Sequence, residues 1–177
     1  MNILTIYFSR KGNNYWNGTV RFLERGNTDL AADFIQEATG CGRFEIEADK
    51  QYPDNYYACT VEAQAELRLK RKVPVKAYTD NLESCGLVFV GYPNWWGTMP
   101  MPVRTFLLHY DWTGKAVAPF CTNEGSGMGR SERDLAECCK GARLLPGLAV
   151  RGCEVREHGR DIAAWAAQCV KETEAYQ

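Results

Sequence analysis

The sequence has almost no excess of charge of either sign, and it lacks the common nucleotide-binding motifs. Its 177 residues include 21 basic and 22 acidic side chains, for a net charge of −1. Nucleic acids and anionic membrane surfaces attract proteins with a basic surplus, so this balance excludes both as main partners. No G-x-x-x-x-G-K-[ST] run and no G-x-G-x-x-G run is present. A P-loop and a dinucleotide-binding fingerprint are therefore excluded as well.

Long apolar runs are also missing. No segment approaches the roughly 20 apolar residues that a membrane-spanning helix needs. The N-terminus enters a strand pattern at once, without the charged and then apolar leader of a signal peptide. We therefore expect neither a membrane span nor a signal peptide.

Cysteine, by contrast, is abundant, and its spacing is uninformative for metals. None of the eight cysteines belongs to a Cys-x-x-Cys pair, and the chain has only two histidines. This excludes a ligand cluster with zinc spacing. Disulfide frameworks are typical of small secreted domains that lack a sizeable core. We therefore expect free thiols that pack as small apolar side chains, no bound metal, and a cytoplasmic protein.

Buried strands alternate with amphipathic helices along the whole chain. Apolar, β-branched runs indicate strands that are covered on both faces, as in a parallel sheet. Five strands are predicted at 2–8, 44–48, 86–93, 115–122 and 143–152, and five helices at 27–40, 55–72, 100–110, 129–142 and 159–176. The pattern predicts one α/β domain over residues 1–177, with a five-stranded parallel sheet between two helical layers.

Two details refine this prediction. The fifth strand contains Pro146, which has no N–H to donate, so we place this strand at the edge of the sheet. Two strand orders remain open, 2-1-3-4-5 and that of half a dinucleotide-binding domain. In both, ligands bind beyond the carboxyl ends of the strands, so the loops after the first, third and fourth strands are the candidate site.

The first of these loops is long and polar. It begins with Ser9-Arg10-Lys11-Gly12-Asn13 and ends with Gly26-Asn27-Thr28, directly before a helix. A helix start presents unpaired N–H groups and a partial positive charge, which together favour an anion. Either Arg10 or Lys11 could add a full charge. The alternative is a surface loop followed by a helix that Thr28 caps.

The other two loops differ in character. Tyr92–Pro100 carries adjacent tryptophans, which can stack on a flat ring at the mouth of a site, although one of them could instead cover the core. Thr122–Glu132 contains three glycines among small polar residues, which allow a close approach of the backbone to a ligand or form a simple turn. Together the loops predict a pocket with an anion end and an aromatic end, the shape of a flavin mononucleotide (FMN).

The stretches "YFSRKGN…GNT", "VFVGYPNWWGTMP" and "PFCTNEGSG" resemble flavodoxins, especially the short-chain subfamily with a Ser-Arg-x-Gly-Asn-Thr first loop. The resemblance covers essentially the whole chain and implies a flavodoxin-like fold of strand order 2-1-3-4-5 with FMN as the cofactor. It implies that the phosphate lies near Ser9, Arg10, Lys11, Asn27 and Thr28. It implies that the isoalloxazine ring lies near Pro93, Asn94, Trp95, Trp96, Gly97, Thr122, Asn123, Glu124 and Gly125.

The sequence departs from this family pattern in the first loop, where about a dozen residues, 14–25, interrupt the motif. Both "GNN" at 12–14 and "GNT" at 26–28 are therefore candidates for the phosphate. We favour the second because only it directly precedes the helix.

Three functions are compatible with these observations. The first is an FMN protein that carries electrons between partners, which are redox proteins or small-molecule donors and acceptors. The second is an NAD(P)H-dependent FMN or quinone reductase of the same fold, and the third is a flavodoxin-like module without flavin. Dedicated electron carriers of this family resemble one another in being strongly acidic, so the near-neutral charge weakens the first reading relative to the second. The sequence does not determine the oligomeric state.

Overall fold

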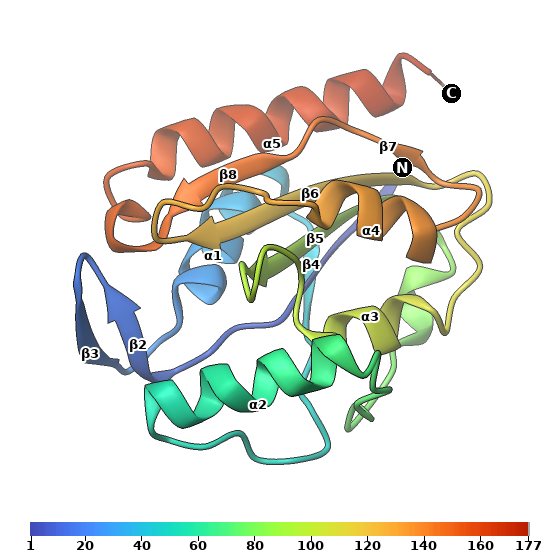
Figure 1. The fold of residues 1–177 in the computed structure, drawn as a ribbon. Helices are drawn as coiled ribbons and strands as arrows, with labels where there is room; N and C mark the ends of the chain where they lie inside the picture. Colours follow the sequence, from blue (N-terminus) through green and yellow to red (C-terminus); the bar gives the residue numbers. More distant parts are fainter. Residues whose placement is uncertain (177) are drawn as a thin grey trace.

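A computed structural model describes residues 1–176, and its centre is a parallel sheet with helices on both faces (Figure 1). Within these residues the sheet has six strands, in the order β4-β1-β5-β6-β7, and β8 also pairs with β6. All of these pairings are parallel. The strands are β1 (Asn2–Tyr7), β4 (Gly42–Glu45), β5 (Cys85–Pro93), β6 (Ala116–Asn123), β7 (Arg143–Leu144) and β8 (Leu148–Arg151).

This order confirms the predicted 2-1-3-4-5 arrangement. The first four predicted strands correspond to β1, β4, β5 and β6. The fifth is divided into β7 and β8, both of which pair with β6 at the edge of the sheet. Pro146 lies in the gap between them, where its missing N–H interrupts the ladder.

The helices cover the sheet in two groups (Figure 1). One face packs against α1 (Asn27–Thr39) and α5 (Gly159–Glu174), and the other against α3 (Met101–Leu107) and α4 (Ser131–Cys138). Next to α3 lies α2 (Tyr56–Arg68), and the short 3₁₀ helices are η1 (Asp80–Leu82) and η2 (Gly152–Glu154).

Side chains alternate along the central strand β5 and so form two apolar cores. Leu87 and Phe89 pack with α1 and α5, whereas Val88 and Val90 pack with α3 and α4. The eight cysteines are free thiols, and all except Cys153 are buried. Among residues 1–176, no helix is both long enough and apolar enough to span a bilayer.

The predicted polar loop over residues 14–25 is wrong, because these residues belong mostly to a β-hairpin. Its antiparallel strands are β2 (Gly12–Trp16) and β3 (Thr19–Leu23), at the left of Figure 1. Between them, Asn17 and Gly18 have φ angles of +43° and +92°. Positive φ at both turn positions is the geometry of a two-residue hairpin, and Asn-Gly is its preferred sequence. The hairpin signal was therefore present in the sequence.

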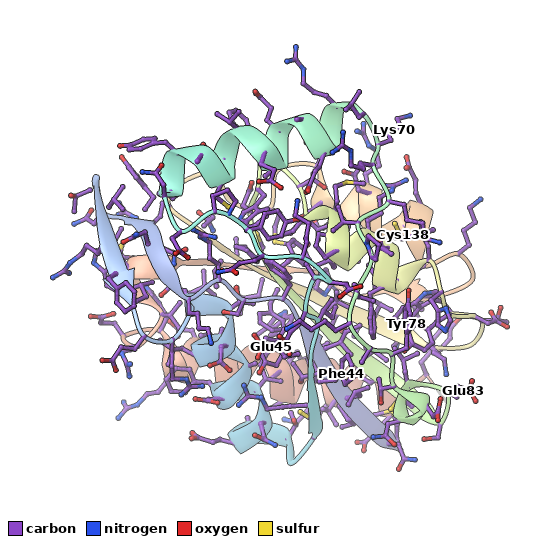
Figure 2. All side chains as sticks on the ribbon, turned by 90° about the horizontal axis from the view of Figure 1, so that it is seen from below. Phe44, Glu45, Lys70, Tyr78, Glu83 and Cys138 are labelled. Atoms are coloured by element: carbon purple, nitrogen blue, oxygen red, sulfur yellow. The ribbon has the colours of Figure 1, made fainter. Side chains whose placement is uncertain are left out.

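The second helix is shorter than predicted. It ends at Arg68 rather than running on towards Pro74. Lys70, labelled in Figure 2, takes a left-handed φ of +47°. Its N–H donates to the Leu67 carbonyl, and the N–H of Arg71 donates to that of Glu66. These two bonds form a Schellman motif, which ends a helix without proline.

The second strand is also displaced from its predicted position. It covers Gly42–Glu45 rather than residues 44–48, and Ala48 instead forms an isolated bridge with Val75.

Candidate functional site

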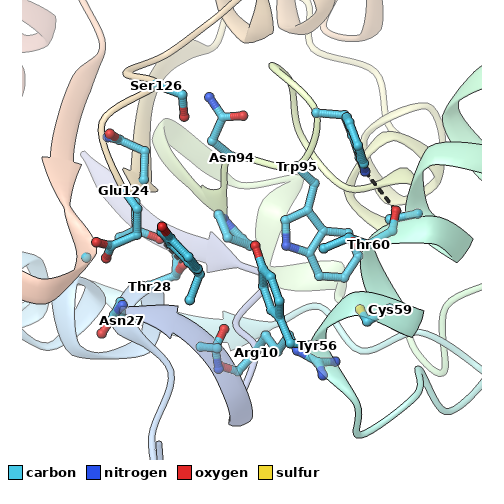
Figure 3. A pocket seen from close by; sticks show the side chains of 18 of the residues that line it. Arg10, Asn27, Thr28, Tyr56, Cys59, Thr60, Asn94, Trp95, Glu124 and Ser126 are labelled. Carbon is cyan, nitrogen blue, oxygen red and sulfur yellow. Dashed lines mark hydrogen bonds between the residues drawn. The ribbon is translucent and has the colours of Figure 1, made fainter. Parts of the chain in front are cut away.

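A cavity of about 590 Å³ opens at the carboxyl ends of β5 and β6, between the hairpin, the first turn of α1 and α2 (Figure 3). Most of the predicted site residues line it. They are Arg10, Asn27, Thr28, Pro93, Asn94, Trp95, Trp96, Gly97, Thr122, Asn123 and Glu124. Ser9, Lys11 and Gly125 are not part of its wall. Three loops that are far apart in the sequence thus meet at one cavity.

The first turn of α1 forms one end of the cavity. Its N-cap is Gly26, so the alternative in which Thr28 caps the helix is wrong. The Ser9 hydroxyl lies outside the cavity wall and accepts a hydrogen bond of 3.1 Å from the Asp29 N–H. It therefore satisfies a donor in the first turn of α1. Thr28 is buried, and its hydroxyl bonds to that of Thr122 at 2.8 Å. This bond joins the start of α1 to the end of β6.

Both candidate phosphate motifs reach the same cavity, through Asn14 and Asn27. The Asn14 amide donates to the carbonyls of Arg10, at 3.0 Å, and Gly12, at 3.1 Å. Asn27 differs, because its buried Oδ1 has no hydrogen-bond partner within residues 1–176. The Asn14 amide thus donates both of its N–H bonds within the protein, whereas the buried Asn27 oxygen is open to a donor from a ligand.

The two charged side chains on the wall are both engaged within the protein. The Arg10 guanidinium donates to the carbonyls of Asn13 at 3.2 Å, Pro53 at 2.8 Å and Asp54 at 3.3 Å. It therefore ties the start of the hairpin to the loop before α2. On the other side, the Glu124 carboxylate accepts the N–H of Asn17 at 3.0 Å and of Cys153 at 2.9 Å. The remaining polar side chains that face a ligand are neutral hydroxyls and amides.

A tight turn shapes the aromatic end. Trp95 and Thr98 exchange backbone hydrogen bonds of 2.9 and 3.3 Å, and the two residues between them, Trp96 and Gly97, have φ angles of +57° and +80°. The Asn94 side chain braces this turn by accepting the Gly97 N–H at 2.8 Å.

The turn is also tied to the loop after β6. Asn94 Nδ2 donates to the Gly127 carbonyl at 2.7 Å, and the Arg130 N–H donates to the Gly97 carbonyl at 2.8 Å. A Cβ at Gly129 would overlap the Gly97 carbonyl, so the two backbones touch. The two loops at the carboxyl ends of β5 and β6 therefore form one connected unit.

The adjacent tryptophans have different surroundings. Trp95 is half-buried and packs edge-on against Phe8, with 5.4 Å between ring centroids, and Tyr52, with 5.1 Å. Trp96 is 47% exposed, and its indole N–H donates to the Thr60 carbonyl of α2 at 2.8 Å, shown by the dashed line in Figure 3. Trp95 thus covers the core, as we expected of one tryptophan, while Trp96 connects the turn to α2.

A half-buried tyrosine, bonded to a buried carboxylate, packs against Trp95. The Tyr52 hydroxyl donates to Glu66 at 2.8 Å, and Glu66, only 1% exposed, is also paired with Lys50. Burial and the Glu66 carboxylate raise the pKa of Tyr52 far above its usual value, so the phenol remains a donor at neutral pH. These bonds hold Tyr52, and Tyr52 in turn holds the Trp95 ring.

The sequence analysis did not predict that the hairpin and α2 contribute side chains to the cavity wall. From the hairpin comes Tyr15, next to Asn14, which was already a candidate as part of the first Gly-Asn run. Tyr56, Tyr57, Cys59, Thr60 and Ala63 come from α2. Burial raises the pKa of Cys59, so its thiol is not activated. The local signal was the pair of tyrosines directly after Asn55, whose side chain caps α2 by accepting the Ala58 N–H.

Comparison with known proteins agrees with the fold. The profile of the flavodoxin family matches residues 19–168. A Bacteroides eggerthii protein provisionally described as a flavoprotein has 25% identity and a TM-score of 0.69, over 92% of this chain and 98% of that one. No curated protein sequence matches the chain.

Two further solved structures share the fold. A Lactobacillus acidophilus flavoprotein in complex with FMN has 19% identity and a TM-score of 0.63, over 88% of this chain and 97% of that one. Oxidised flavodoxin 2 from Bacillus cereus has 18% identity and a TM-score of 0.58, over 97% and 99%. The profile match begins after residues 9–13, so membership of the Ser-Arg-x-Gly-Asn-Thr subfamily stays a prediction.

Proposed function

The chain belongs to the flavodoxin family, and we propose that it binds FMN and uses it to carry electrons between a donor and an acceptor. The single observation that carries this proposal is the cavity, which joins a helix N-terminus to a tryptophan turn at the carboxyl edge of the sheet. FMN has a terminal phosphate at one end and a flat ring system at the other. The two ends of the cavity offer the groups that each requires.

The phosphate end relies on neutral donors and on the helix. The first N–H groups of α1 lie at this end, and they attract an anion together with the helix dipole. Thr28 and Asn27 stand in the first turn, and among the described residues the buried Oδ1 of Asn27 has no partner, so a ligand hydroxyl could donate to it. These residues fit a phosphate followed by a polyhydroxy chain.

The ring end relies on Trp95 and on the connected loops. Trp95 offers an aromatic surface, and the bonds of Asn94 and Arg130 keep its turn in one position. When bound, FMN supplies the redox chemistry. The residues of this chain bind and orient it and keep water away from its ring.

A second candidate is an enzyme in which the same FMN oxidises NAD(P)H and reduces a small acceptor. The net charge of −1 favours it, because a nearly neutral carrier has little electrostatic guidance towards a protein partner. Steady-state oxidation of NADPH by the FMN-loaded protein, with and without a quinone, separates the candidates. Sustained turnover supports the enzyme, and its absence supports the carrier.

Thr28→Ala tests the phosphate end. We expect about tenfold weaker FMN binding and nearly unchanged riboflavin binding, because riboflavin lacks the phosphate that the hydroxyl and the first turn would bind. The apo-protein should also lose about 1 kcal/mol of stability with the Thr28–Thr122 bond. Fluorescence titration with each flavin and urea unfolding provide the measurements.

Thr173→Ala is the matched control for this experiment. Thr173 is similarly buried, and its hydroxyl donates to the Cys169 carbonyl in α5, away from the cavity. It should lose comparable stability and bind both flavins normally. Equal losses of FMN and riboflavin affinity in Thr28→Ala would place the phosphate elsewhere.

A further inference from the structure

Three tyrosines form a continuous aromatic surface on the hairpin and α2 side of the cavity. Tyr15 stacks on Tyr56, with ring centroids 5.9 Å apart and an interplanar angle of 28°. Tyr57 meets Tyr56 edge-on at 5.3 Å. All three line the cavity, and we call them the tyrosine wall. It lies outside the three loops that account for the phosphate and ring ends described above.

The tyrosine wall carries no charge. The neighbouring cavity residues of α2 are Cys59, Thr60 and Ala63, all neutral. Arg10 is the only cationic side chain among the described residues that line the cavity, and its guanidinium already binds three backbone carbonyls. The phosphates of a nicotinamide nucleotide would find no available cation here. Three aromatic rings beside neutral side chains favour a flat, uncharged molecule on this surface.

The wall nevertheless offers hydrogen-bond donors. Each tyrosine carries a phenolic O–H. Burial, followed by the neighbouring Tyr15 and Tyr57, raises the pKa of Tyr56, so its phenol stays protonated at neutral pH. A protonated phenol can donate to a carbonyl oxygen, while the phenol ring stacks on a flat partner.

The cavity also connects the tyrosine wall to the tryptophan turn. Trp96 is bonded to Thr60, one helical turn after Tyr56 and Tyr57, and both Trp95 and Tyr56 project towards the middle of the cavity in Figure 3. A flat molecule on the wall would therefore lie beside the ring end of the proposed flavin site. A short separation between the two rings is what electron transfer requires.

We propose that the tyrosine wall binds the electron acceptor, a neutral, flat, carbonyl-bearing ring of the quinone class. This inference rests on the proposed function, because the acceptor would receive its electrons from FMN held by the three loops. It assigns a role to the hairpin, which supplies Tyr15 to the wall and would shape the acceptor site.

The test uses menadione, a simple naphthoquinone, with the FMN-loaded protein. Tyr56→Ala should weaken menadione binding by about tenfold or more, and the FMN dissociation constant should stay within about twofold. Tyr56→Phe keeps the ring and loses the donor, so a smaller loss of menadione affinity is expected. Equilibrium dialysis measures menadione, and flavin fluorescence measures FMN in separate titrations.

Two variants complete the design. Tyr176→Ala is the control, because Tyr176 is 76% exposed near the C-terminus and should leave both affinities unchanged. Tyr15→Ala removes a second member of the wall from the exposed hairpin, and it applies the same test should Tyr56→Ala not fold.

The outcomes separate the two proposals. Unchanged menadione binding in both the Tyr56 and Tyr15 variants would overturn the acceptor site. A parallel loss of FMN affinity would also overturn it, because the wall would then contact the cofactor. Failure of the wild-type protein to bind FMN would instead refute the proposed function, whatever the menadione titration gives.

Discussion

Gly26→Ala is expected to weaken FMN binding by at least about tenfold and to lower the free energy of unfolding by roughly 2–3 kcal/mol. Gly26 is the buried N-cap of α1, with an ordinary φ of −73°, so the problem is space rather than backbone strain. A Cβ there would overlap Ser9 Oγ and lie 2.6 Å from the Arg10 carbonyl oxygen. The start of α1 would have to move away from the segment that follows β1, and the proposed phosphate end would move with it.

Urea unfolding of the apo-protein and FMN titration measure the two effects. Gly42→Ala is the control, since its Cβ would meet only the flexible end of Leu4, at 3.3 Å, and should change stability far less. A Gly26→Ala protein with normal stability and normal FMN affinity would show that the first turn of α1 does not form the phosphate end.

Trp95→Ala is expected to cost about 3 kcal/mol of stability, because a large aromatic side chain is removed from a packed site. Phe8 and Tyr52 would lose their edge-on partner, and the Tyr52–Glu66 bond would lose the ring that it supports. FMN affinity should also fall by about tenfold with the loss of the aromatic surface.

Trp96→Ala is the matched comparison. Trp96 is exposed, and its main contact is the hydrogen bond to the Thr60 carbonyl, so about 1 kcal/mol of stability should be lost. The same unfolding and flavin titrations apply to both variants. If Trp96→Ala weakened FMN more than Trp95→Ala, the exposed indole would be the one that contacts the ring.

The candidate site was predictable where one segment carries its own signal. Asn27 and Thr28 directly precede a helix pattern, and the tryptophan pair follows a buried strand, so each could be assigned to the carboxyl edge of the sheet. The tyrosine wall could not be predicted in this way. Tyr15 and Tyr56 are 41 residues apart, and no local pattern indicates that a hairpin and a helix bring their rings together.

The hydrogen-bond partners of the polar residues could not be predicted from the local sequence either. Arg10 looked like an anion ligand in a polar loop, yet its guanidinium donates to the carbonyls of the distant residues Pro53 and Asp54. Ser9 was likewise a candidate for the phosphate, but its hydroxyl accepts a hydrogen bond from the N–H of Asp29. Which partner a polar side chain takes depends on the backbone groups that folding places within about 3 Å, and these come from other segments.

By itself, the sequence determined the class of the fold, and the family resemblance implied the strand order. Buried apolar strands that alternate with amphipathic helices can bury both faces only in a parallel sheet, and the loop motifs resemble those of one family. Tertiary structure alone decided that Trp95 packs inward while Trp96 reaches α2, and that the hairpin contributes Asn14 and Tyr15 to the cavity wall. Strand and helix periodicity is a local property of the chain. The wall of a cavity is instead set by contacts between distant segments, whose geometry exists only once the sheet has assembled.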